Sequence, residues 1–219
     1  MVNEKLFTSR KERLKDATLV AIFRMAKADH AVEGAGAAVR GGFEAVEITL
    51  NTAGATDALI EVAGRGDALV GAGTVIAPGQ VKEAYDAGAE FIVTPVVVPD
   101  VVEASHDLSL PVIVGASTPT EVFHAHAAGA DWVKVFPVES LGGPGYIELL
   151  LGPLHGIPLL VSGGVTGSNY LTYLDAGAEL IGFTNDVFDP DLAAEGRYDE
   201  LERRAIEINR RLDEYLTEE

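Results

Sequence analysis

A single lysine interrupts an apolar run that otherwise has the character of a buried strand, Asp131-Trp-Val-Lys-Val-Phe-Pro-Val-Glu139. An ammonium group loses its hydration in such a place, so Lys134 needs either a carboxylate partner or a chemical role. Burial favours the neutral form of an amine, and a neutral amine can attack a carbonyl carbon to form a Schiff base. The alternative is an ion pair that serves only packing. The other five lysines lie in polar or helix-like surroundings, where we expect them to be solvated.

A glutamate and an arginine occupy comparable places in other apolar runs. Glu47 lies within Ala45-Val-Glu-Ile-Thr-Leu-Asn51, where an apolar wall would suit it to general acid–base catalysis. Its alternative role is to pair with Lys134 or Arg24. Arg24 ends an early run and could bind a carboxylate or phosphate through its guanidinium fork, or form an ion pair at the rim of the protein.

Glycines follow two later apolar runs, in Ser162-Gly163-Gly164-Val165 and in Gly182-Phe-Thr184. Glycine lets the backbone approach an anion closely, and peptide N–H groups can hold a phosphate without a cation. That property suits a chain with few basic residues, although glycines for tight turns are the ordinary explanation.

The elements that must position these side chains follow from a repeated pattern. Four segments combine a helix end at a glycine with an apolar strand within two or three residues. They begin at Gly41, Ala87, Ala128 and Ala176. Further apolar strands begin at Thr18, Leu69, Pro111 and Pro158, which makes eight.

Eight nearly continuous apolar strands that alternate with helices predict a parallel sheet buried on both faces. We expect an α/β fold, a single (β/α)8 TIM barrel domain over residues 1–219; an open doubly wound sheet is the alternative. Active sites of such barrels lie at the carboxyl ends of the strands. Alternation along the strands then directs Lys134 and Glu47 into one pocket.

Four helical segments can be predicted with their ends. Residues 3–15 form an extra N-terminal helix, and a helix over residues 29–40 has Asp29 as its N-cap. Thr118-Pro-Thr-Glu121 has the spacing of a capping box at a helix start. Residues 191–219 form one long, charged final helix.

Composition excludes several classes of function. The net charge of the 219 residues is −18, from 34 acidic and 16 basic side chains, and such a surface repels nucleic acid and anionic membranes. There is no cysteine, so thiolate chemistry and disulfides are excluded.

No apolar run is long enough to span a membrane and the N-terminus is too charged for a signal peptide, so we expect a cytoplasmic protein. The acidity favours a halophilic source over an acidic mesophilic enzyme.

No cofactor is predicted. His124 and His126 are two residues apart on a helix and face different ways, so they make poor joint metal ligands. The HExxH, Walker A and complete GxGxxG patterns are absent. We therefore expect neither a metal ion nor a nucleotide cofactor.

A set of six motifs, in order along the chain, resembles the 2-keto-3-deoxy-6-phosphogluconate (KDPG) aldolases and the sister 2-keto-3-deoxy-6-phosphogalactonate aldolases. The motifs are Glu47-Ile-Thr-Leu, Gly71-Ala-Gly-Thr-Val75, Thr94-Pro95, Gly115-Ala-Ser-Thr118, Val133-Lys-Val-Phe-Pro137 and Gly163-Gly-Val165. The resemblance implies a class I aldolase of the Entner–Doudoroff type that uses no cofactor and is typically a homotrimer.

The resemblance also implies residue roles. Lys134 would form the Schiff base with the C2 ketone of a phosphorylated keto-deoxy sugar acid. Glu47 would accept the C4 hydroxyl proton as the C3–C4 bond breaks, and later return a proton to the enamine that becomes pyruvate. Thr74 would hydrogen-bond in the pyruvate pocket, with Pro95 and Phe136 as its walls.

The remaining roles concern the two ends of the substrate. Gly163, Gly164 and Thr184 would bind the phosphate, and Ser162 would contact the substrate nearby. Asn51 stands where KDPG-type sequences often carry the arginine that holds the carboxylate, so Arg24 takes that role, as in the galactonate type.

The markers of the two subfamilies disagree. Ser162 is a hydroxyl, like the threonine of the gluconate enzymes and unlike the valine of the galactonate enzymes, and Gly182-Phe-Thr184 replaces Gly-Gly-Ser. Either epimer, or both, remains open as the substrate. Two other functions stay open: an isomerase or epimerase with Glu47 as base, and a barrel that binds sugar-acid phosphates without catalysis.

Overall fold

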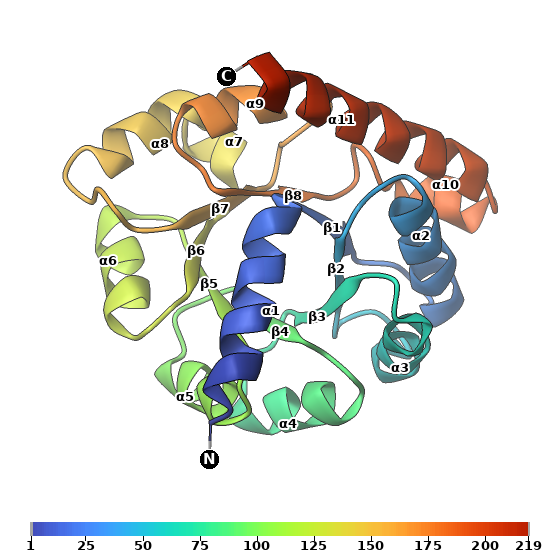
Figure 1. Ribbon diagram of the computed structural model, residues 1–219, viewed down its shortest axis with the longest axis horizontal. Coiled ribbons are helices and arrows are strands. Elements are labelled where there is room, and N and C mark those ends of the chain that lie inside the picture. Colours follow the sequence, from blue (N-terminus) through green and yellow to red (C-terminus); the bar gives the residue numbers. More distant parts are fainter. Residues whose placement is uncertain (1, 219) are drawn as a thin grey trace.

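Eight parallel strands close into a barrel in the computed structural model, which describes residues 2–218 (Figure 1). Each strand pairs with its neighbours in sequence, and β8 closes the ring by pairing with β1. The predicted (β/α)8 barrel with an extra N-terminal helix is therefore confirmed. The strands are β1 Leu19–Phe23, β2 Ala45–Thr49, β3 Leu69–Gly73, β4 Phe91–Thr94, β5 Val112–Ala116, β6 Trp132–Val135, β7 Leu159–Ser162 and β8 Leu180–Phe183.

Helices surround the barrel, and the glycine pattern of the sequence marks where several of them end. Gly42, Gly88, Gly129 and Gly177 have φ between 96° and 100°, the left-handed conformation that the repeated pattern predicts. The helices are α1 Glu4–Ala17, α2 Ala28–Arg40, α3 Ala55–Arg65, α4 Pro78–Asp86, α5 Pro99–Asp107, α6 Pro119–Ala127, α7 Val138–Leu141, α8 Gly143–Leu151, α9 Tyr170–Asp175, α10 Pro190–Ala194 and α11 Tyr198–Glu218. Within residues 2–218, no helix is both long and apolar enough to cross a membrane.

Two helix predictions were wrong in detail. Asp29 does not cap α2; the helix begins one residue earlier, and Lys27 occupies the N-cap position without a side-chain hydrogen bond. The predicted helix over residues 191–219 is divided into α10 and α11, because Gly196 has φ 73° between them. Residue 219 lies outside the described residues. The capping box of Thr118 and Glu121 at the start of α6 is confirmed.

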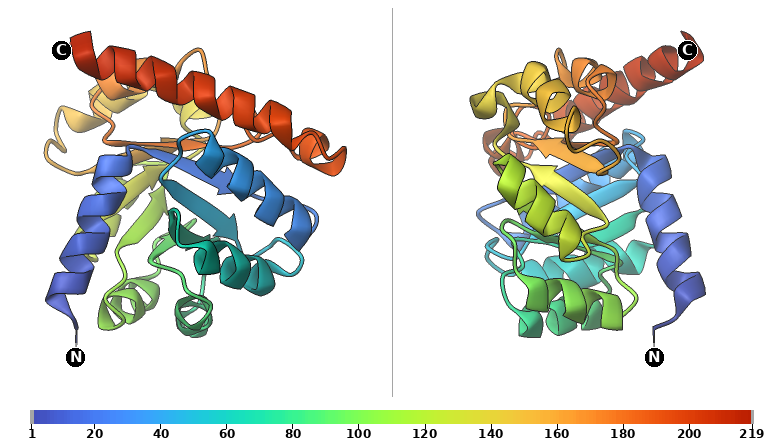
Figure 2. Two further views of the ribbon diagram at one scale, coloured as in Figure 1. Left: turned by 45° about the vertical axis from the view of Figure 1, so that its right-hand side comes forward. Right: turned by 90° about the vertical axis from the view of Figure 1, so that its left-hand side faces the viewer.

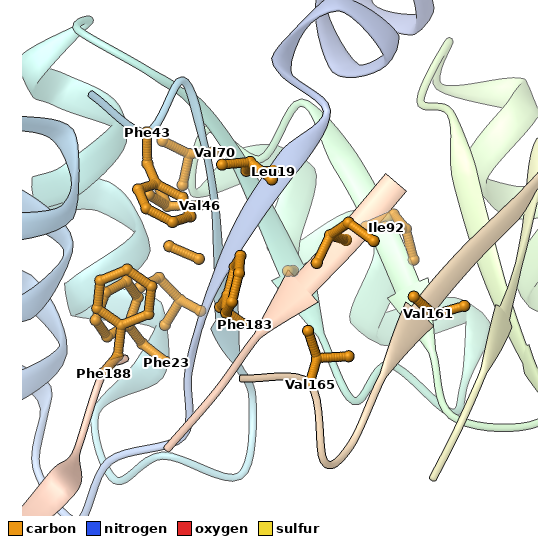
Figure 3. Close-up of a cluster of buried hydrophobic side chains, with 14 of the residues drawn as sticks. Leu19, Phe23, Phe43, Val46, Val70, Ile92, Val161, Val165, Phe183 and Phe188 are labelled. Atoms are coloured by element: carbon orange, nitrogen blue, oxygen red, sulfur yellow. The ribbon is translucent and has the colours of Figure 1, made fainter. Parts of the chain in front are cut away.

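The apolar side chains of the strands form two layers. Those that point outward pack against the helices, and Figure 3 shows four phenylalanines, Phe23, Phe43, Phe183 and Phe188, within this outer layer. The ring of Phe188 lies 4.9 Å from that of Phe23 and 5.1 Å from that of Phe43. Those that point inward fill the barrel: Val20, Ile22, Ala45, Leu69, Phe91, Val93, Ile113, Trp132, Leu160 and Leu180. Burial on both faces explains why the strands are nearly continuous apolar runs.

Helix α1 closes the end of the barrel where the strands begin (Figure 2, left). Its Leu14 is fully buried and belongs to the cluster inside the barrel. Its polar side chains bind residues that lie shortly before strands: Arg10 donates to the Ser109 carbonyl oxygen at 3.0 Å, and Arg13 pairs with Glu90 at 2.9 Å. Helix α1 does not cover the opposite end of the barrel, where the strands finish and the predicted site residues lie.

A buried carboxylate ties α1 to the barrel. Asp131 Oδ1 accepts a hydrogen bond from Lys11 of α1 at 2.8 Å. Its Oδ2 accepts from the Val112 N–H at 2.9 Å and lies 3.1 Å from His106 Nε2 of α5. Burial acts to raise the pKa of Asp131, but these hydrogen bonds and the charge of Lys11 outweigh it and lower the pKa below its ordinary value.

Candidate active site

The side chains of Lys134 and Glu47 meet inside the barrel, although they come from strands β6 and β2, which are not neighbours. Lys134 Nζ lies 3.3 Å from Glu47 Oε2. The side chain of Lys134 is only 12% exposed and that of Glu47 only 2%. The attraction between the two charges is therefore the main compensation for the hydration that each loses on burial. An amine in such a place can form an imine with the carbonyl group of a ligand, and the carboxylate beside it can accept or donate a proton.

Glycine at the end of β3 makes room for this carboxylate. A Cβ atom on Gly73 would lie 1.9 Å from Glu47 Oε1, so no larger residue fits without displacing the glutamate. The next residue, Thr74, has φ 61°, a conformation that costs free energy in any residue other than glycine. Backbone strain of this kind occurs preferentially at functional sites.

A small pocket, called the cavity below, opens above the pair at the carboxyl ends of the strands. Its lining residues are Arg24, Glu47, Thr74, Val93, Pro95, Gly115, Lys134 and Phe136. Six of these eight were predicted as site residues from the sequence.

Val93 and Gly115 were missed, and each had a signal in the sequence. Val93 is an inward residue of β4 by alternation. Gly115 belongs to a strand-end motif, and a Cβ atom there would lie 2.2 Å from the Pro95 carbonyl oxygen. Glycine at that position therefore keeps the loop after β4 close to the cavity.

Arg24 is a cation that lines the cavity. It is exposed, and its side chain makes no hydrogen bond or ion pair within residues 2–218. Asn51 is exposed and does not line the cavity. Arg24 is therefore available to an anionic group of a ligand.

Four predicted residues lie at the same end of the barrel but outside the cavity lining: Ser162, Gly163, Gly164 and Thr184. Ser162 Oγ is buried and has no hydrogen-bond partner among the described residues. Gly163 is in contact with the cavity wall, since a Cβ atom there would lie 2.8 Å from the Phe136 ring. Ser162 pairs in register with Gly182, so the two glycine-containing loops leave adjacent strands.

The loop of Gly163 and Gly164 presents free donors. Both residues have positive φ, 85° and 92°, and the structure gives their N–H groups no acceptor within residues 2–218. The Gly163 carbonyl oxygen accepts from the Glu139 N–H at 3.1 Å. Two consecutive free N–H groups at a strand end can bind an anion.

Glu139 is in turn held by a buried tyrosine. Tyr173 donates from its hydroxyl to Glu139 Oε2 at 2.7 Å. Burial, followed by this hydrogen bond and the charge of Glu139, raises the pKa of Tyr173 well above its usual range. The tyrosine thus remains a neutral donor and joins α9 to α7.

Over residues 2–218, no group of three or more His, Asp or Glu side chains is arranged to hold a metal ion. His124 and His126 lie on α6, outside the cavity lining.

Comparison with known proteins gives a consistent result. Residues 11–204 match the family described as "Aldolase: KDPG and KHG aldolase". The chain is 32% identical over 201 residues to the KHG/KDPG aldolase of Escherichia coli (strain K12), covering 91% of this chain and 94% of that protein. It is 37% identical over 174 residues to the 2-dehydro-3-deoxy-6-phosphogalactonate aldolase of the same strain, covering 78% and 84%. A solved structure described as "Native KDPGal structure" superposes with a TM-score of 0.83 at 32% identity, covering 91% of this chain and 96% of that one.

Proposed function

Because this chain belongs to the KDPG and KHG aldolase family, and is thus a lyase, we propose that it cleaves 2-keto-3-deoxy-6-phosphogluconate to pyruvate and glyceraldehyde 3-phosphate through a Schiff base. One observation carries the proposal: the Lys134 amine lies 3.3 Å from the Glu47 carboxylate at the base of a cavity, and both are almost fully buried.

Lys134 is the nucleophile. Its neutral amine adds to the C2 ketone, and loss of water gives a protonated imine. The positive imine nitrogen accepts the electron pair released when the C3–C4 bond breaks, so the pyruvate half becomes an enamine.

Glu47 moves the protons. Its carboxylate takes the proton of the C4 hydroxyl while that oxygen becomes the aldehyde of glyceraldehyde 3-phosphate. The resulting carboxylic acid then gives a proton to C3 of the enamine. Hydrolysis of the imine releases pyruvate and restores the Lys134 amine.

The other residues bind the substrate. We assign the carboxylate to Arg24, supported by its free guanidinium in the cavity, and a hydrogen bond in the pyruvate pocket to Thr74. Pro95 and Phe136 form the walls of this pocket. The remaining predicted residues, which bind the phosphate end of the substrate, are Ser162, Gly163, Gly164 and Thr184.

Borohydride reduction in the presence of pyruvate tests the mechanism. The expected result is a stable adduct on Lys134, identified by peptide mass spectrometry, that is absent from Lys134→Arg. A protein that releases pyruvate without forming an adduct would contradict the Schiff base. A protein that interconverts sugar phosphates without an adduct would be the isomerase or epimerase considered above, and one that binds but does not turn over its ligand would be a binding protein.

The same chemistry on 2-keto-3-deoxy-6-phosphogalactonate is the second candidate. It is favoured by the 37% identity to an aldolase named for that substrate and by the free Arg24 in the cavity. A coupled assay of pyruvate release with each epimer separates the two, because the ratio of the kcat/KM values measures the preference directly.

Three properties of the whole protein belong to the proposal: a homotrimer, a cytoplasmic location and adaptation to high salt. Gel filtration with light scattering tests the trimer, and a monomer at micromolar concentration would contradict it. Fractionation of the source cells tests the location.

A further inference from the structure

The backbone on both sides of Arg24 is held by two buried threonine hydroxyls. Thr49 Oγ1 donates to the carbonyl oxygen of Phe23, the residue before Arg24, at 3.2 Å. The N–H of Met25, the residue after Arg24, donates to Thr52 Oγ1 at 3.1 Å. The two threonines are 0% and 3% exposed, so water does not compete for these bonds.

The segment that carries the threonines is itself fixed. The Thr52 N–H donates to the Thr49 carbonyl oxygen at 2.9 Å, and the two hydroxyl oxygens lie 3.4 Å apart. The Leu50 N–H donates to the Gly73 carbonyl oxygen at 2.8 Å, which attaches the segment to the end of β3. Thr49 is the last residue of β2, two positions after Glu47. The hold on Arg24 is therefore built on the strand that carries the proposed acid–base.

The Arg24 side chain has no such support. It lines the cavity, is exposed, and makes no hydrogen bond or ion pair within the described part of the chain. Its backbone therefore sets the point from which the side chain reaches into the cavity. A cation that must meet a carboxylate with good geometry gains affinity when its attachment point does not move.

We propose that Thr49 and Thr52 are positioning residues for Arg24, and that their hydroxyls set how tightly the enzyme holds the carboxylate of its keto-acid substrate. The inference rests on the proposed function, in which Arg24 binds that carboxylate. It assigns a role in the reaction to two side chains outside the cavity lining.

Thr52→Val tests the proposal because valine keeps the shape and removes the acceptor. One lost hydrogen bond predicts a rise in KM of about 3- to 10-fold with kcat nearly unchanged. Thr52→Ser keeps the hydroxyl and should restore KM. Thr49→Val removes the donor on the other side and should raise KM similarly, which keeps the test open if the Thr52 variant does not fold. Ser105→Ala is the matched control, since it removes a buried hydroxyl on α5 that bonds the Val101 carbonyl oxygen.

A double-mutant cycle separates positioning from general stability. If the threonines act through Arg24, Thr52→Val has no further effect on KM in an Arg24→Gln background. The same fold-change in both backgrounds, or no change in KM from either valine variant, would overturn the inference. Failure of the unmodified protein to release pyruvate would instead refute the proposed function.

Discussion

Lys134 and Glu47 show how a pair of buried charges limits the substitutions that can be interpreted. Each ion compensates for the desolvation of the other, so removing one leaves an unpaired charge in the barrel. A variant that truncates either side chain tests folding as well as chemistry. Replacements that keep size and polarity are the informative ones.

Glu47→Gln keeps the size of the side chain but cannot accept or return a proton. We expect kcat for pyruvate release to fall by about 10²- to 10⁴-fold. The borohydride adduct of pyruvate should still form on Lys134, because imine formation needs the amine. Glu61→Gln, on the exposed face of α3, is the control and should leave both measurements unchanged. Full kcat in the Glu47 variant would remove it from the mechanism.

Gly73→Ala places a methyl group where the Glu47 carboxylate lies. A displacement of about 1 Å at the reacting groups is expected to lower kcat by about 10²-fold. Gly79→Ala is the matched control, since nothing lies within 4 Å of its Cβ position on α4. Circular dichroism melting should show that the Gly73 variant is folded. An active Gly73→Ala enzyme would mean that the glutamate has room to move.

At the scale of elements, α1 depends on a few polar contacts for its place beneath the barrel. Asp131 is a buried member of these contacts and bonds three elements of the chain at once, through Lys11, His106 and Val112. Because its folded pKa is lowered, its contribution to stability is complete above its unfolded pKa of about 3.9 and is lost as the pH falls through the lower folded value.

Asp131→Asn should therefore lower the free energy of unfolding by about 2–3 kcal/mol at pH 7. The difference from the unmodified protein should narrow as the pH falls below about 4, where Asp131 of the unfolded chain begins to be protonated. Urea titrations of both proteins at pH 7 and below about pH 4 measure the loss of stability and its dependence on pH. Asp86→Asn, which breaks an exposed pair with Lys82 on α4, should cost less than about 0.5 kcal/mol. A difference that stays constant with pH would contradict the role of the Asp131 charge.

The ends of helices were predicted correctly from the sequence where a residue type favours one structural position. Glycines such as Gly88 and Gly129 mark helix ends because few other residues adopt positive φ. Asp29 was placed wrongly because an aspartate suits the N-cap and the first turn equally. The predicted helix over residues 191–219 continued past Gly196 because glycine also occurs inside helices.

The candidate site divides in the same way. Lys134 and Glu47 could be found because a charge in an apolar strand is unusual. Thr49 and Thr52 could not, because their partners are backbone atoms of Phe23 and Met25, which any sequence would supply. The sequence alone does not indicate which loop packs beside these two threonines.

At the scale of the molecule, the net charge of −18 over 219 residues opposes folding through self-repulsion. Molar salt reduces the Debye length to about 3 Å and screens this repulsion. If the protein is adapted to high salt, its melting temperature should rise by about 5–10 °C between 0.1 M and 2 M KCl, which corresponds to about 2–3 kcal/mol at this chain length.

Sucrose at matched osmolality is the control for this measurement, because it favours compact states without screening charge. A melting temperature that is equal at both KCl concentrations would contradict the adaptation.

The plug of Leu14 and the filled interior of the barrel leave the cavity with one mouth. In the proposed reaction, the water that hydrolyses the imine must come through the opening by which the aldehyde leaves. A bound aldehyde stands between the imine carbon and this opening, so its departure clears the path for the water of hydrolysis. A barrel open at both ends would give water a second route to the imine carbon.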